Sequence, residues 1–431
     1  MNKKLVALCL VSIGVTSIPV TMEAQLHPAK QKEGDITIVV GEDNPGKEVI
    51  NVFVDNSPKA YSAADLPTFA IIGKNKKFYL GLGGYAKTTL SYDFGNPITN
   101  GNEFTTSAIP MNNPKGNDGL VQFSAQTSNI FANFVALPGD DNQLGIYVSG
   151  NFLANNYNFQ LSFAYLNFRG FTVGYNYTLF CDVAASAPSI DYEYAPAFTI
   201  IPNTVIDYTH AFNSRWSMGI GLESPIASAT TNASTYMVNQ RVPDIPAYAQ
   251  YSWNKGNSWV RLGAIMRNMA YWDKVGEKTR NATAWGVNLS GSATLLPHLT
   301  SYYQMAYGKG ISSYFQDLYN GNLDMVPSQT PGKLETVKAW GGFLGLQYNF
   351  TPNTFASCTY SQLRDYAPEY ADGSISFGNQ YKYAQYLVGN LFWNVAPRVQ
   401  MGVEYIYGRR VNMDATSHHN NRVQTMVKFN F

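Results

Sequence analysis

The chain has 431 residues with a formal net charge of +1 at pH 7, and only 14% of its residues are Asp, Glu, Lys or Arg. Since about 25% is typical of soluble proteins, this composition argues against a large soluble domain, and the balanced charge gives no reason to expect nucleic acid as a partner. Aromatic and small residues are abundant instead, with 30 Tyr, 24 Phe and 36 Gly. We therefore expect an all-β fold, a transmembrane antiparallel β-barrel, because lipid-facing and lumen-facing residues alternate along its strands.

Residues 1–24 have the layout of a secretory signal peptide. Lys3 and Lys4 precede an apolar stretch without charges, Leu5–Val20, and Ala24 offers a cleavage site. The apolar stretch is short for a membrane-spanning helix, which needs about 20 residues. We therefore expect the chain to be exported.

Residues 25–76 carry more charge than the rest of the chain. They contain two short β-like runs, Ile36–Val40 and Val49–Val54, separated by turn residues. We expect a small periplasmic N-terminal extension, such as a hairpin, ahead of a barrel that occupies residues 77–431.

Sixteen alternating runs follow, and we expect each to form one strand of the barrel wall. The gaps after even-numbered runs are short and most gaps after odd-numbered runs are long, as in outer-membrane barrels with periplasmic turns and external loops. This parity requires 119–137 to be one strand and not a hairpin. The runs are 78–93, 119–137, 143–153, 157–168, 171–180, 202–211, 215–223, 245–254, 258–271, 281–296, 298–308, 334–350, 353–364, 380–396, 398–409 and 419–431.

Charged residues share one side of the predicted strands. In the last run Val423 and Val427 alternate with Arg422 and Lys428. A charge on the lipid face costs about 2–4 kcal/mol at mid-membrane, so we expect the charged side to face a wet lumen. The residues predicted to line the lumen wall are Lys87, Asp207, Arg261, Arg267, Arg364, Glu404, Arg422 and Lys428.

A barrel of about 16 strands is too wide to be filled by its own wall side chains and therefore leaves a water channel. We expect a loop folded inward to narrow it, and 181–201 is the best candidate. Its acids Asp182, Asp191 and Glu193 would face basic wall residues and set a transverse field across the constriction. The alternative for each acid is that it only holds the loop by hydrogen bonds to the wall.

Several motifs resemble the DcaP-like family of outer-membrane porins. They are Gly83–Lys87 in the first wall strand, Gly174–Asp182 before the inward loop, Tyr307–Ile311, and Gly402–Arg410 near the end. The resemblance implies a 16-stranded trimeric porin in the outer membrane of a Gram-negative cell envelope, surrounded by outer-membrane lipid. It also implies passage of small polar, often anionic, solutes, and it places Phe431 in the signal read by the barrel-assembly machinery.

Three other functions remain as alternatives. A structural or adhesive surface barrel would use the long loops. An energised transporter would need about 22 strands and a plug domain. An enzyme would need a fixed constellation such as Ser or Asp with His, but the histidines are scattered and the adjacent His418–His419 pair is a weak metal site, so we expect no enzyme, cofactor or metal. We expect a diffusion channel with a weak anion preference, because the predicted wall residues are mostly basic.

Overall fold

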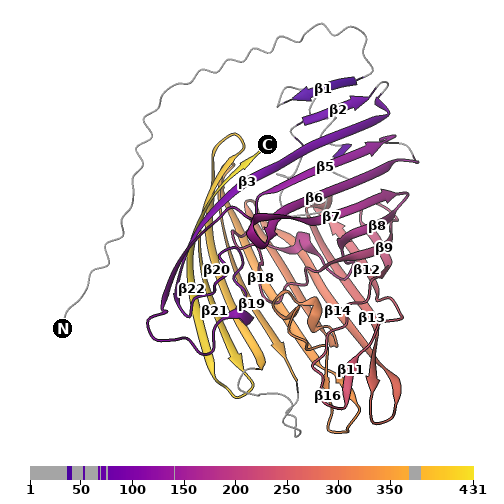
Figure 1. Ribbon diagram of the computed structural model, residues 1–431. Helices are drawn as coiled ribbons and strands as arrows, with labels where there is room; N and C mark the ends of the chain where they lie inside the picture. The colour runs from indigo at the N-terminus through magenta and orange to yellow at the C-terminus, as the bar shows by residue number, and fades with distance from the viewer. Residues whose placement is uncertain are drawn as a thin grey trace, which may run out of the picture. The chain divides into compact units, whose positions relative to one another are not determined.

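The computed structural model of the chain describes residues 36–40, 52–53, 67, 69–73, 76–139, 141–367 and 380–431. The signal peptide predicted for residues 1–24 lies outside these residues. Within them, sixteen antiparallel wall strands close into a barrel (Figure 1), because the last strand pairs with the first along the register Asn420↔Gly95 to Asn430↔Tyr85. The predicted fold class is confirmed. The described residues contain no helix long and apolar enough to cross a membrane.

The wall strands follow one another around the barrel in chain order. They are β3 (Phe78–Gly95), β4 (Gly119–Ser124) together with β5 (Asn129–Ala136), β6 (Leu144–Ala154), β7 (Asn158–Phe168), β8 (Phe171–Tyr177), β9 (Pro202–Ala211), β10 (Trp216–Glu223), β12 (Ile245–Trp253), β13 (Ser258–Asp273), β14 (Lys278–Leu296), β15 (Leu299–Lys309), β18 (Lys338–Thr351), β19 (Thr354–Asp365), β20 (Tyr381–Ala396), β21 (Val399–Asn412) and β22 (Ser417–Asn430).

The remaining elements are short and lie between or before the wall strands. The strands are β1 (Ile36–Val40), β2 (Phe69–Gly73), β11 (Thr235–Met237), β16 (Met325–Pro327) and β17 (Leu334–Thr336), and the single-turn helices are η2 (Thr106–Ala108), η3 (Asn155–Tyr157), η4 (Val183–Ala185), η5 (Asn254–Gly256), η6 (Ser312–Tyr314) and η7 (Gln316–Leu318). The run predicted at 334–350 therefore begins late as a wall strand, because β17 pairs with β16 in a separate small sheet.

The run predicted at 119–137 occupies one position in the wall, as expected. β5 pairs with the first half of β3 and β4 pairs with the second half. The two are separated by a break at residues 125–128, where the wall ladder is interrupted. The Ser128 hydroxyl accepts a hydrogen bond from the Lys87 amide at 3.0 Å, so a side chain supplies the partner that the broken ladder lacks.

Short turns join the wall strands at one end of the barrel, here called the turn end, and long loops join them at the other, the loop end. The turn end includes Arg169–Gly170 and Pro397–Arg398, where Arg169, Gly170 and Arg398 have positive φ angles. The loops between β3 and β4, between β8 and β9, and between β15 and β18 are the long ones that matter below.

The N-terminal strands extend the sheet at the turn end. β22 stops where Phe431 and Gly84 exchange two backbone hydrogen bonds of 2.9 Å, and beyond this point β2 pairs with β3 and β1 pairs with β2 (Figure 1). The predicted strand Ile36–Val40 is confirmed. The prediction of a strand at 49–54 is wrong for its described residues, since Val52 and Phe53 are helical, and Phe53 packs in a cluster with β2, β3 and β5.

Side-chain facing follows the predicted alternation in β13 and β22. Leu262 and Met266 are 56% and 63% exposed on the outside of the wall, whereas Arg267 is 3% exposed. In β22 Val423 is on the exposed side and Arg422 is fully buried. The apolar side thus faces outward, where lipid contact is favourable.

Arg364 is the exception among the predicted lumen residues, and that prediction is wrong. Its neighbours Leu363 and Asp365 are buried on the inner side, so Arg364 points outward. It lies at the loop end of β19, and its guanidinium stacks over Tyr366 at 4.5 Å from the ring centre. A long cationic side chain at a strand end can place its charge in the interfacial region beyond the lipid tails.

Cys181 and Cys358 are both free thiols. Cys181 is buried in the loop after β8, whereas Cys358 is exposed on the outer side of β19. The wall lies between them, so no bridge forms, because a disulfide requires Cα atoms within about 7 Å.

Candidate functional site

In the part of the chain that the structure describes, three loops fold into the barrel, whereas we had predicted one from the sequence. Tyr314, Phe315 and Leu318 of the β15–β18 loop are buried in one cluster with Phe180 of the β8–β9 loop. Phe104 and Ile109 of the β3–β4 loop are buried in another cluster with Phe198. The three loops therefore share apolar cores inside the wall and narrow the lumen together.

Asp182 holds the β8–β9 loop against the wall. Its carboxylate accepts hydrogen bonds from the Trp259 indole at 2.9 Å and the Ser290 hydroxyl at 2.7 Å. It is buried and does not line the cavity described below. For this acid the geometry is that of the alternative stated above, a hydrogen-bonded anchor.

Asp191 and Glu404 connect the same loop to the last strands. The Glu404 carboxylate accepts the backbone N–H groups of Ile190 and Asp191 at 2.9 and 3.0 Å. Asp191 in turn accepts the Phe104 amide and the Tyr386 hydroxyl, both at 2.9 Å. Burial raises the pKa of Asp191 to about 7, and the nearby Glu404 carboxylate adds to the rise.

Glu193 and Asp317 complete an acidic group shared by the three loops. The Thr105 hydroxyl donates to Glu193, the Thr106 hydroxyl donates to Asp317, and the Ser107 amide donates to Asp317 at 3.2 Å. Burial raises the pKa of Glu193 well above its ordinary value, with Asp317 adding to the effect. Burial also raises the pKa of Asp317 to about 6. Asp317 is not predictable from the sequence, because nothing local marks its loop as inward.

Arg267 lies in a buried ionic network and does not line the cavity. It donates to Asp244 at 2.9 Å and to Asp324 at 3.1 Å, and the side chains of all three residues have no exposed surface. Its guanidinium also lies 4.9 Å from the ring centre of Tyr314. The network joins the β10–β12 and β15–β18 loops to β13.

Arg422 forms a second buried ion pair, with Asp93 across the β22–β3 seam. The two are register partners, and the pair is closed by bonds of 2.5 and 3.0 Å. Arg422 also donates to the Asn100 carbonyl at 2.8 Å, which draws the β3–β4 loop inward. Asp93 was missed in the sequence, although it lies on the same side of its strand as Lys87.

The other predicted wall residues lie inside the barrel with different surroundings. Arg261 stacks on Tyr248 at 3.7 Å and donates to the Leu179 carbonyl at 2.6 Å. Asp207 is buried on the inner face of β9. Lys87 donates to the Ile190 carbonyl at 2.9 Å, and Lys428 lies 4.0 Å from the ring centre of Tyr85; both line the cavity.

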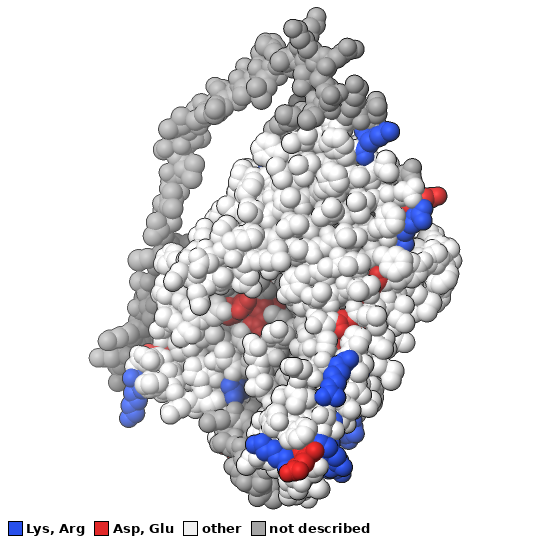
Figure 2. Space-filling view, turned by 45° about the vertical axis from the view of Figure 1, so that its right-hand side comes forward, with Lys and Arg blue, Asp and Glu red and all other residues white. Residues whose placement is uncertain are grey.

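A cavity of about 1380 Å³ remains between the inward loops and the β5–β8 part of the wall. Figure 2 shows a hollow in one face of the molecule with acidic side chains inside it. The charged residues that line the cavity are Lys87, Arg410, Lys428, Glu103, Asp191, Glu193 and Asp317. The wall opposite the β8–β9 loop is lined by uncharged residues, namely Tyr147, Ser149, Asn151, Gln160, Ser162 and Tyr177. On this side the loop acids therefore face no basic wall residue, and the basic residues that line the cavity lie on β3, β21 and β22.

Comparison with known protein families decides the identity of this barrel. A family model described as porin subfamily matches residues 82–428. The chain belongs to this porin family. The resemblance predicted from the sequence is thereby confirmed, and this porin is an outer-membrane channel protein. A comparison with curated proteins finds no match.

Solved porin structures have the same fold. The outer membrane channel DcaP of Acinetobacter baumannii superposes with a TM-score of 0.70 at 17% identity, covering 83% of this chain and 99% of that one. OmpT of Vibrio cholerae has a TM-score of 0.52 at 11% identity over 84% and 99% of the two chains. An anion-selective porin from Comamonas acidovorans has a TM-score of 0.52 at 12% identity over 82% and 100%. At these identities the likeness concerns the fold alone.

Proposed function

We propose that this porin passes small polar solutes by passive diffusion along the cavity beside the β8–β9 loop. The observation that carries this proposal is that the cavity extends from the turn end of the wall strands toward their loop end. Its lining includes Tyr302 and Lys428, near the turn end of their strands, and Arg410, near the loop end of β21. Its volume of about 1380 Å³ exceeds the roughly 300–1,000 Å³ typical of a small-molecule pocket, as expected for a passage and not a closed site.

Single-channel recording in a planar bilayer tests diffusion directly. We expect discrete current steps that are ohmic in voltage, and swelling of liposomes in solutions of small sugars and amino acids. A structural or adhesive barrel would instead be folded and electrically silent. A silent preparation that keeps the heat-modifiable gel mobility of a folded barrel would therefore contradict the channel.

The sign of the charge selectivity follows from four acids and three bases along the cavity. Four of the six basic residues that led us to expect an anion preference do not line the cavity. Arg267 and Arg422 are ion-paired, Arg261 donates to the Leu179 carbonyl, and Arg364 points outward. The acids have raised pKa values. We therefore place the anion preference in the acidic range, where these carboxyls are neutral, and a weak cation preference at alkaline pH.

A homotrimer, which the family resemblance implies, also belongs to this proposal. β8 has 7 residues and β10 has 8, whereas a strand that crosses the hydrocarbon core needs about 9–11. Apolar side chains nevertheless point outward here, including Val173 and Ile220. Contact with another copy of the chain would cover this short sector better than lipid would.

Mass measurement of the detergent-solubilised porin tests the assembly. We expect three copies per particle, and we expect Ile220→Arg to shift the particle to single copies that retain barrel gel mobility. Leu344→Arg, on the exposed outer face of β18, is the matched control and should remain trimeric. A monomeric parent protein would contradict the trimer.

Export and assembly complete the proposal. Residues 1–24 would direct the chain to the periplasm, and residues 25–76 would stay on that side, since β2 joins the turn end of β3. Phe431 pairs with Gly84 at the seam between the last and first wall strands, a position suited to recognition by the barrel-assembly machinery. Outer-membrane lipid would contact the apolar outer face.

A further inference from the structure

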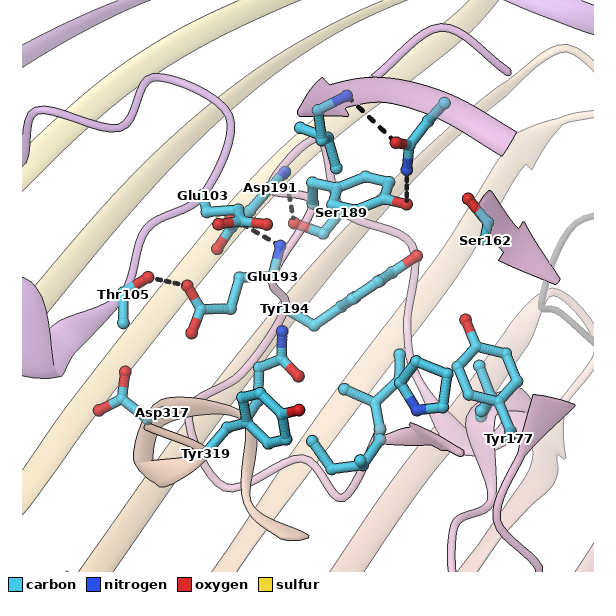
Figure 3. A pocket seen from close by; sticks show the side chains of 18 of the residues that line it. Glu103, Thr105, Ser162, Tyr177, Ser189, Asp191, Glu193, Tyr194, Asp317 and Tyr319 are labelled. Carbon is cyan, nitrogen blue, oxygen red and sulfur yellow. Dashed lines mark hydrogen bonds between the residues drawn. The ribbon is translucent and has the colours of Figure 1, made fainter. Parts of the chain in front are cut away.

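The narrow part of the cavity is bordered by tyrosines and small polar side chains. Figure 3 shows Tyr194 from the β8–β9 loop, with Tyr177 and Ser162 from the wall, directed into one opening. In the same view Glu193 and Asp317 lie on the other side of Tyr194. A solute in this opening therefore lies beside the rings of Tyr177 and Tyr194, and the two acids are separated from it by Tyr194.

Tyr192 limits the opening on one side. Its hydroxyl accepts a hydrogen bond of 2.9 Å from the Asn151 side chain on β6, and Asn151 is itself held by the Leu153 amide at 3.1 Å. This contact joins the inward loop to the wall that it faces. The passage is thus confined to the sector in which Tyr177, Tyr194 and Ser162 lie.

Further aromatic rings lie along the inner face of β5 to β8, next to the opening. Tyr147 stacks on Tyr165 with ring centres 5.5 Å apart and on Phe131 at 5.7 Å, with interplanar angles of 21° and 20°. One step nearer the loop end, Phe163 packs edge-on against Tyr177 at 4.8 Å. Of these rings Tyr147, Phe163 and Tyr177 line the cavity, and the ring contacts order them before a solute arrives.

This combination matches the chemistry of sugars. A pyranose ring presents C–H groups on its faces, which pack on the electron-rich face of an aromatic ring, and hydroxyl groups at its edges. Tyrosine and serine hydroxyls and the amides of asparagine and glutamine both donate and accept hydrogen bonds, so they serve any orientation of those edges. The uncharged opposing wall offers no counter-charge to a carboxylate.

We propose that the opening formed by Tyr177, Tyr194 and Ser162 is a transit site for neutral oligosaccharides. The inference rests on the proposed channel function and names its solute class. Binding is weak, because each sugar ring must leave again for transport to continue. Anions and aliphatic chains of similar size pass without being held.

Current blockade by maltotriose tests the site. Single channels are recorded at pH 8 with rising maltotriose, and with polyethylene glycol of similar mass as the size control. We expect maltotriose to produce brief blockades that saturate with concentration, and polyethylene glycol to produce only a proportional fall in current. Tyr177→Leu and Tyr194→Leu should each weaken the maltotriose blockade roughly tenfold, since they remove a stacking ring.

Two further variants keep the outcome decisive. Tyr177→Phe retains the ring and loses the hydroxyl, so we expect a weakening of roughly threefold. Tyr360→Leu, a tyrosine on the exposed outer face of β19, should leave the blockade unchanged. Conduction without a saturable maltotriose blockade, or equal blockade in all variants, overturns the sugar site and leaves the channel intact. A folded barrel without conductance overturns both.

Discussion

Replacing Arg267 with Met is expected to lower the free energy of unfolding of this porin by about 3–5 kcal/mol, because breaking a buried ion pair leaves its partner uncompensated. Asp244 and Asp324 both lie within 3.1 Å of the guanidinium, and neither side chain has exposed surface. Met fills much of the volume but supplies no charge. Two carboxylates would then remain in a site shielded from water, and the loops that they anchor would loosen.

Denaturant unfolding of the protein in lipid vesicles measures this change, with single-channel conductance as a second readout. We expect the conductance to rise because the β15–β18 loop is released from the lumen. Arg215→Met, at an exposed turn, is the matched control and should change neither quantity. The triple variant Arg267→Met, Asp244→Asn, Asp324→Asn should recover part of the loss. An unaltered unfolding curve for Arg267→Met would show that the network contributes nothing net.

The second large effect is an inversion of charge selectivity with pH. The cavity carries more negative charge at pH 8 than at lower pH, because Asp191 and Asp317 are then mostly ionised, so we expect a weak cation preference there. Burial places the pKa of Asp191 at about 7 and that of Asp317 at about 6, and it raises the pKa of Glu193. A raised carboxyl pKa means that negative charge is lost as the pH falls through this range. By pH 5 the bases Lys87, Arg410 and Lys428 dominate, and we expect an anion preference.

Reversal potentials under a salt gradient, recorded between pH 5 and 8, measure the inversion. The charged and hydroxyl groups around Asp191 are Glu404, Arg422, Tyr386 and Lys87, and those around Glu193 are Asp317, Asp191, Thr105 and Glu103. The variant Asp191→Asn, Glu193→Gln, Asp317→Asn should be anion-selective at every pH. Glu277→Gln, an exposed residue of the β13–β14 turn, should behave as the parent. A reversal potential that does not move with pH would refute the assignment of these acids to the passage.

Local patterns carry the features that sequence analysis predicted well. Alternation with a period of two is visible within each run, so the number of wall strands, the outward side of Val423 and the inward side of Arg422 follow from residues a few positions apart. The gap lengths then assign turns and loops to opposite ends. Lipid outside and water inside impose the same constraint on every strand, which is why one rule is sufficient for most of the wall.

The same rule misplaced Arg364, because it treats every charge in a strand as a lumen charge. At a strand end the outward face borders the interfacial region and not hydrocarbon, so a cation is tolerated there.

The strand β2 was also missed. The edge of β3 with which β2 pairs is open only because β22 ends at Phe431. Nothing in the sequence of residues 69–73 indicates this open edge.

The passage itself was decided by tertiary structure. Whether Arg267 is a pore charge or a buried anchor depends on Asp324, 57 positions away, and Arg422 depends on Asp93, 329 positions away. The inward path of three loops arises from apolar clusters shared between them, which no single loop reveals. Composition and periodicity thus determined a sixteen-stranded water-filled barrel. Only long-range packing decided which polar groups neutralise one another and which line the cavity, namely tyrosines, four acids and three bases.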